Sequence, residues 1–174
     1  MQFCVMTIQA RSRASQRGVA ALGSLRLPCA LGRGGRLARK REGDGATPIG
    51  VWPVRAVLYR PDRVRRPRTA LPVSPIEPRD GWCDDPHDRN YNRPVRLPYP
   101  AGHEVLWRED HLYDVVAVIG YNDWPRARGR GSAIFMHLAS SDFAPTEGCI
   151  ALRENHLRLL LAAVGPRTMV RVSA

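Results

Sequence analysis

The 174-residue sequence lacks the features that mark membrane and secreted proteins. No apolar run approaches the roughly 18 residues that a membrane-spanning helix requires, which excludes an integral helical membrane protein. A secretory signal needs a basic start, an apolar core and a small-residue cleavage site. The stretch Gly18 to Leu25 imitates such a core only weakly, because Arg26 interrupts it and Leu27-Pro28-Cys29 is a poor lipoprotein site. We therefore expect no clear signal peptide.

Cysteine is also scarce, and its spacing excludes two common uses. Cys4, Cys29, Cys83 and Cys149 lie far apart, and no C-x-x-C pair is present. A structural zinc site or a dithiol redox motif therefore has no support. One disulfide stays open as an alternative. We expect no metal and no cofactor.

Arginine supplies nearly all of the positive charge behind the net charge of +11. Such a charge suits a polyanionic surface, whether nucleic acid, anionic lipid or an acidic wall polymer, without choosing among them. The arginines are scattered in loops, without the interleaved aromatics of a single-strand binder or a basic recognition helix. We interpret them as solvated loop charges and expect no specific nucleic-acid partner.

Length and turn-forming residues predict a single, mainly β domain. A chain of 174 residues is long enough for one core and short for two ordinary domains. Fifteen prolines and fifteen glycines disfavour long helices. We expect a disordered segment over residues 1–17, one catalytic-type domain over 18–174, and a monomer.

Hydrophobic patterns place the elements of this domain. We expect a hairpin before the Gly32–Gly35 turn and a long ordered loop over the proline-rich residues 60–100. Apolar residues at positions 157, 160, 161 and 164 follow helical spacing, and Gly165-Pro166 ends that helix. The remaining strands are expected over residues 51–59, 113–119, 132–138 and 168–172.

A histidine and a cysteine near the C-terminal end form a candidate nucleophile pair. His137 ends an apolar strand, and Cys149 follows a glycine after a proline-bounded loop, twelve positions later. This arrangement exposes a thiol beside free backbone N–H groups and presents an imidazole at a sheet edge. A small buried cysteine and a core histidine would give the same spacing, so both interpretations stay open on these residues alone.

Two segments resemble the catalytic domain of the L,D-transpeptidases, also called the YkuD domain. Residues 146–152 (TEGCIAL) follow the family pattern Ser/Thr-His-Gly-Cys and Ile/Val-Arg-Met/Leu, and residues 45–52 (GATPIGVW) resemble its Thr-Pro-x-Gly-x-aromatic element. The chain also resembles a compact subgroup with Gly-Ser-Ala-Ile-Phe-x-His and Pro-Thr-Glu-Gly-Cys, from about residue 25 onward. The resemblance implies a β-sandwich of mixed sheets with one short helix in the C-terminal half.

The departures from this pattern are specific. Glu147 stands where the family has histidine, and Ala151 stands where it has arginine. Leu138-Ala139 replaces the Gly-Thr after the strand-borne histidine, and the intervening loop is shorter. The chain therefore resembles a divergent branch, and the changes fall where the substrate carboxylate and the oxyanion are held.

The resemblance implies a role for each site residue. Cys149 is the nucleophile, His137 is its base, and the carbonyl of Leu138 fixes the imidazole tautomer. An imidazolium beside the thiol is expected to lower its pKa. Backbone N–H groups of Gly148 and Cys149 are the natural oxyanion donors, and Thr146 orients the loop. The candidates for substrate binding are Glu147, Ser140 and Ser141. Glu147 points away, pairs with an arginine, or meets the acceptor amine.

The implied substrate is the peptide stem of peptidoglycan. The thiolate attacks the carbonyl of the L-centre of meso-diaminopimelate in a tetrapeptide stem, releases D-alanine and leaves a thioester, which a second stem's amine resolves into a 3→3 crosslink. Two alternatives stay open: an L,D-carboxypeptidase, in which water resolves the thioester, and a non-catalytic cell-wall-binding module. The resemblance implies the periplasm or cell envelope, with a cytoplasmic role on wall precursors left open.

Overall fold

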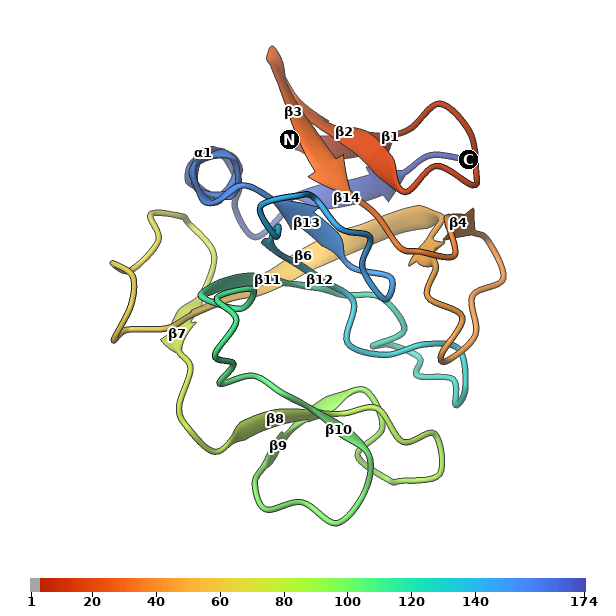
Figure 1. Cartoon of the computed structure of the whole chain (residues 1–174), viewed down its shortest axis with the longest axis vertical. Coiled ribbons are helices and arrows are strands. Elements are labelled where there is room, and N and C mark those ends of the chain that lie inside the picture. Colours follow the sequence, from red (N-terminus) through yellow and green to blue (C-terminus); the bar gives the residue numbers. More distant parts are fainter. Residues whose placement is uncertain (1–3) are drawn as a thin grey trace.

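A computed structural model describes residues 4–174, and strands dominate it (Figure 1). The one α-helix among these residues is α1 (Glu154–Ala163). The strands are β1 (Val5–Gln9), β2 (Arg17–Leu22), β3 (Leu25–Ala30), β4 (Arg36–Leu37), β5 (Thr47–Pro48), β6 (Gly50–Tyr59), β7 (Val73–Pro75), β8 (Asp80–Cys83), β9 (Arg93–Arg96), β10 (His103–Val105), β11 (Val115–Ile119), β12 (Phe135–Leu138), β13 (Ile150–Leu152) and β14 (Met169–Val172).

The largest sheet has mixed pairing and turns back on itself. Its strand order is β11-β12-β13-β3-β2-β1-β14-β6-β7, and β11 also pairs with β6. The β1–β14, β12–β13 and β6–β7 pairs are parallel, and the other pairs in this sheet are antiparallel. The expected mainly β fold of mixed sheets with one helix in the C-terminal half is confirmed.

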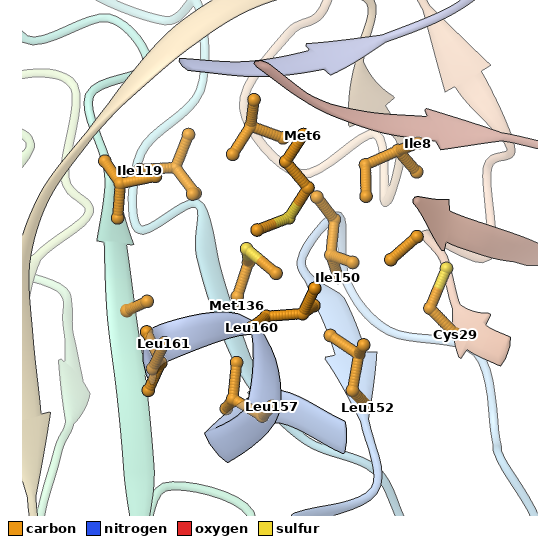
Figure 2. Close-up of a cluster of buried hydrophobic side chains, with 14 of the residues drawn as sticks. Met6, Ile8, Cys29, Ile119, Met136, Ile150, Leu152, Leu157, Leu160 and Leu161 are labelled. Atoms are coloured by element: carbon orange, nitrogen blue, oxygen red, sulfur yellow. The ribbon is translucent and has the colours of Figure 1, made fainter. Parts of the chain in front are cut away.

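The main core lies where the inner faces of these strands meet the helix. Met6 from β1, Met136 from β12 and Ile150 from β13 gather in one buried cluster, and Leu157 and Leu160 of α1 cover it (Figure 2). Burial of large apolar side chains from both ends of the chain stabilises this arrangement. The core thus fixes β12 and β13 side by side, which matters for the site because both carry its residues.

The expectation of disorder over residues 1–17 is wrong for residues 5–9. These residues form β1, which pairs in parallel with β14 and antiparallel with β2. Met6 and Ile8 are buried on its inner face. The strand is short and its partner β14 lies at the other end of the sequence, so local pattern gave little sign of it. Residues 1–3 of the predicted segment lie outside the described residues.

The long loop expected over residues 60–100 contains more structure than predicted. It includes β7, and β8 and β9, which form a small separate sheet with β10 (Figure 1). These strands have three or four residues each, too few for their periodicity to stand out among prolines. Trp82 of β8 packs edge-on against Phe135 of β12, with ring centroids 5.2 Å apart. This contact joins the small sheet to the strand that carries the candidate histidine.

Other predictions hold with shifted boundaries. β2 and β3 form the expected hairpin, and β11 and β12 start two and three residues later than expected. All four cysteines are free, so the disulfide left open by the sequence is not formed. No helix of residues 4–174 is long and apolar enough to cross a membrane.

Candidate active site

A cavity of about 400 Å³ opens beside the ends of β12 and β13, and both His137 and Cys149 line it. His137 lies on β12, and Cys149 immediately precedes β13. Because these strands pair in parallel, with His137 opposite Ala151, Cys149 lies level with Phe135, and the two candidate side chains share one face of the sheet. The structure therefore brings the predicted pair together around one space.

A single backbone contact fixes the imidazole of His137. Its Nδ1 lies 2.8 Å from the carbonyl oxygen of Leu138. A carbonyl only accepts hydrogen bonds, so Nδ1 carries the proton and Nε2 of the neutral ring is left as an acceptor. The Tyr113 ring packs against this imidazole at a centroid distance of 5.2 Å. Burial lowers the pKa of His137 to about 4.

Backbone groups hold the thiol of Cys149. Its Sγ–H donates to the carbonyl of Ala133, and the N–H of Phe135 donates to Sγ, both at 3.3 Å. Burial raises the pKa of this thiol to about 12, although the Phe135 N–H opposes the rise. Only 7% of the residue is exposed. The sulfur is therefore a protonated thiol at neutral pH.

These values correct the expected charge state of the pair. An imidazolium beside a thiolate was expected, but burial disfavours the charged form of both groups. The free protein holds a neutral imidazole and a neutral thiol. A proton can then move from sulfur to Nε2 only as a reaction begins, which is general-base chemistry rather than a preformed ion pair.

Gly148 is required by a close approach between the two segments that carry the family resemblance. Its φ is +129°, and a Cβ at this position would lie 2.7 Å from the carbonyl oxygen of Ala46. The neighbouring Thr47 accepts a hydrogen bond at its hydroxyl from the N–H of Gly32. The segments around residues 46 and 148, about a hundred positions apart, therefore pack directly against each other.

Thr146 braces the loop in front of the cysteine. Its hydroxyl donates to the carbonyl of Cys149 at 2.7 Å and accepts from the N–H of Gly148 at 3.2 Å. Its backbone N–H donates to Leu31, and its carbonyl accepts from Arg33. The hydroxyl thus bridges two backbone groups of residues 148 and 149 and stabilises the turn that carries the thiol. It also accepts from the N–H of Gly148, which the sequence suggested as an oxyanion donor.

The three residues expected to bind substrate lie in different environments. Glu147 lies at the rim of the cavity, and 71% of its side chain is exposed. Its two carboxylate oxygens share the Nε–H of Arg33, each at 2.8 Å from Nε. Ser140 lines the cavity, but its hydroxyl donates to Asp142. Ser141 is exposed and lies outside the cavity lining. Of the options for Glu147, the structure shows the pairing with an arginine.

The cavity wall carries charged residues that the sequence did not single out. Glu42, Asp84 and Glu104 line it together with one cation, Arg108. Burial raises the pKa of Glu104 and of Asp84, and the neighbouring Glu42 raises that of Asp84 further. Arg108 lies over the Tyr113 ring at 4.9 Å and pairs with Asp110. No local motif could have found them, because they come from separate segments: the loop before β5, the position after β8, strand β10 and the loop that follows it.

A buried amide binds the backbone N–H of Ala133, the residue whose carbonyl accepts from the thiol. Asn92 Oδ1 accepts from the N–H of Ala133 at 3.1 Å and from the indole N–H of Trp82 at 2.9 Å. Its Nδ2 donates to the carbonyls of Tyr121 and Asn122. Four bonds thus satisfy this side chain and connect the small sheet to the segment before β12.

Comparison with known proteins identifies a family and a similar solved structure. A family model of the L,D-transpeptidase catalytic domain, YkuD, matches residues 13–172. The crystal structure of L,D-transpeptidase 1 from Mycobacterium tuberculosis aligns with 98% of this chain and 59% of that chain, at 13% sequence identity and a TM-score of 0.44. A search of curated proteins gives no significant match.

Proposed function

Because the chain belongs to the L,D-transpeptidase catalytic domain (YkuD) family, we propose that it is a cysteine acyltransferase acting on peptidoglycan stem peptides. The observation that carries the proposal is the pair of residues at one cavity: a buried thiol at Cys149 and an imidazole at His137 whose Nε2 is left free to accept its proton. No third acidic side chain is needed, because the Leu138 carbonyl already sets the tautomer.

In the first half-reaction, His137 takes the proton of Cys149 as sulfur attacks the peptide carbonyl. The Sγ–H must leave the Ala133 carbonyl for this transfer, while the Phe135 N–H can stay and stabilise charge on sulfur. The tetrahedral intermediate then collapses to a thioester, and the imidazolium returns the proton to the departing amine of D-alanine.

The developing oxyanion needs backbone donors in this mechanism. We assign the N–H of Cys149 this role. The N–H of Gly148 joins it only if it releases the Thr146 hydroxyl, to which it donates in the free protein. Glu147 lies in a pair with Arg33 at the rim, which keeps its negative charge from opposing the oxyanion.

In the second half-reaction, an amine resolves the thioester. The carboxyl groups of Glu42, Asp84 and Glu104 favour the approach of a cationic acceptor amine over an anionic one. The ammonium first loses one proton to solvent, because only the free amine can attack the thioester carbonyl, and a second proton passes through His137 to the departing Cys149 sulfur as the amide bond forms. These carboxyl groups support transfer, and a 3→3 crosslink as its product, over release by water as in a carboxypeptidase. Product analysis with and without an added amine separates the two reactions. Since the proposed substrate is part of the cell wall, the proposed location of the protein is the cell envelope.

Cys149→Ala tests the proposal directly. The wild-type protein should gain the mass of an acyl group after incubation with tetrapeptide or a carbapenem, and the variant should gain none because it has no nucleophile. Intact-mass spectrometry measures both. Cys83→Ala, which removes another buried thiol, serves as the matched control and should form the adduct at the wild-type rate.

Retention of more than a few percent of adduct formation by Cys149→Ala would contradict the assignment. The remaining alternative, a wall-binding module without catalysis, predicts no adduct on either protein.

A further inference from the structure

A second concave surface lies next to the thiol cavity, and the mechanism above does not use it. This groove of about 1100 Å³ runs between the N-terminal strands and the loop over residues 140–145. One side comes from the end of β1, the start of β2 and Arg26 of β3, and the other comes from Phe143, Ala144 and Pro145. Strand β3, which pairs with β13, links it to the site (Figure 1).

Three exposed arginines and one carboxylate, Asp142, give the groove a net positive charge. The arginines are Arg11, Arg17 and Arg26, and none forms an ion pair within residues 4–174. Arg17 and Arg26 donate only to backbone carbonyls. Asp142 stays ionised, because its hydrogen bonds from Ser140 and from backbone N–H groups and its attraction to Arg17 lower its pKa, so it offsets one of the three positive charges.

The groove and the cavity share one wall. Ala144 and Pro145 line both. Hydrogen bonds hold this wall in place on both sides. On one side the Arg17 guanidinium donates to the carbonyl of Asp142 at 2.8 Å. On the other side the backbone of Thr146 bonds to the backbone of Leu31 and Arg33. A chain that crosses it passes from a basic surface into an acidic cavity.

We propose that this basic groove binds the acyl donor upstream of the carbonyl that Cys149 attacks, by recognising a carboxylate-bearing, extended peptide. The inference rests on the proposed function. Arginine is suited to carboxylates because its planar fork donates two parallel bonds. Val19 and Phe143 give the groove apolar surface for the intervening side chains.

Binding to a catalytically inert protein tests the groove alone. In the Cys149→Ala background, titrate two labelled tetrapeptides, Ala-Glu-Lys-Ala and Ala-Gln-Lys-Ala, which differ only in the carboxylate. Adding Arg11→Gln and Arg26→Gln together should weaken the glutamate peptide about three- to tenfold, since each exposed charge contributes modestly, and leave the glutamine peptide unchanged. These two arginines are chosen because Arg17 also holds the loop.

The charge-matched control is Arg66→Gln with Arg128→Gln, two exposed arginines outside the groove. It should bind both peptides as the parent does. An equal loss in this control would mean that net charge alone attracts the peptide, and an equal loss for both peptides would mean that no carboxylate is recognised; either result overturns the proposal. Adduct formation by the wild-type protein, measured in parallel, tests the acyl transfer separately.

Discussion

At the residue scale, burial decides how Cys149 and His137 work. Both side chains are almost enclosed, and both are held in their neutral forms at ordinary pH. Enclosure suits acyl transfer because it keeps competing water from the reacting carbon. It also means that the thiol has no activation until a substrate displaces its hydrogen bond to Ala133.

His137→Gln should slow acylation of Cys149 by about 10² to 10⁴, the usual contribution of general acid–base help. Glutamine can still donate to the Leu138 carbonyl, so the fold should persist. The wild-type rate should stay level as pH falls and drop only near pH 4, where the imidazole protonates. Stopped-flow acylation against pH measures both effects.

His87→Gln, which changes an exposed histidine, is the control and should match the wild type. A wild-type rate that already falls near pH 6.5 would contradict the neutral pair. An unchanged rate in His137→Gln would mean that His137 is only a core residue.

Glu147→Gln should change neither half-reaction by more than about twofold, because exposed ion pairs contribute little and this carboxylate is already paired with Arg33 at the rim. The rate of adduct formation and its amine-dependent decay are measured separately. Faster acylation with weaker transfer would instead show that the carboxylate reaches into the cavity.

At the element scale, Asn92 connects the small sheet of β8, β9 and β10 to the main sheet. The side chain is 5% exposed and has all four bonds satisfied, and its φ of 54° lies in the left-handed region that asparagine tolerates. Trp82 adds an aromatic contact from the same sheet to β12. The small sheet therefore positions the carbonyl of Ala133, and through it the thiol.

Asn92→Ala should lower the free energy of unfolding by about 2 to 4 kcal/mol, because it leaves buried backbone groups without partners. Urea denaturation measures this. Asn92→Gly loses the same side-chain hydrogen bonds, but glycine adopts the left-handed backbone of this position without strain. The difference in unfolding free energy between the two variants therefore measures the backbone strain of alanine at this position. Asn90→Ala, which loses one bond to Tyr99, should cost far less. A neutral Asn92→Ala would refute the connecting role.

At the scale of the whole molecule, His137 makes stability depend on pH. Its pKa is 6.5 in an unfolded chain and about 4 in the folded one, so the unfolded chain binds the proton more readily between these values. The free energy of unfolding should therefore fall by roughly 3 kcal/mol as pH drops from 6.5 to 4, and no further below that from this group. Cys149 acts oppositely, with stability lost as pH rises from 9 towards 12.

His137→Gln removes this dependence, so the difference in unfolding free energy between wild type and variant should narrow or reverse between pH 6.5 and 4. Urea titrations at several pH values give the unfolding free energy of each protein against pH. Subtracting one from the other removes the contributions that the two proteins share, those of the carboxylates and of the remaining charged groups. A constant difference would show that His137 has an ordinary pKa and is not enclosed.

Local pattern was enough to predict what is local in this protein. Apolar runs located β6, β11, β12 and α1 to within a few residues, because the period of a strand or helix is set by neighbours along the chain. The spacing of His137, Gly148 and Cys149 indicated the candidate pair in the same way.

Only folding decided what depends on distant partners. The pairing of β1 with β14, the acidic wall from residues 42, 84 and 104, and the carbonyl of Ala133 on the thiol join separate segments. Backbone groups carry no signature in a sequence, and the charge state of a buried group follows from what surrounds it.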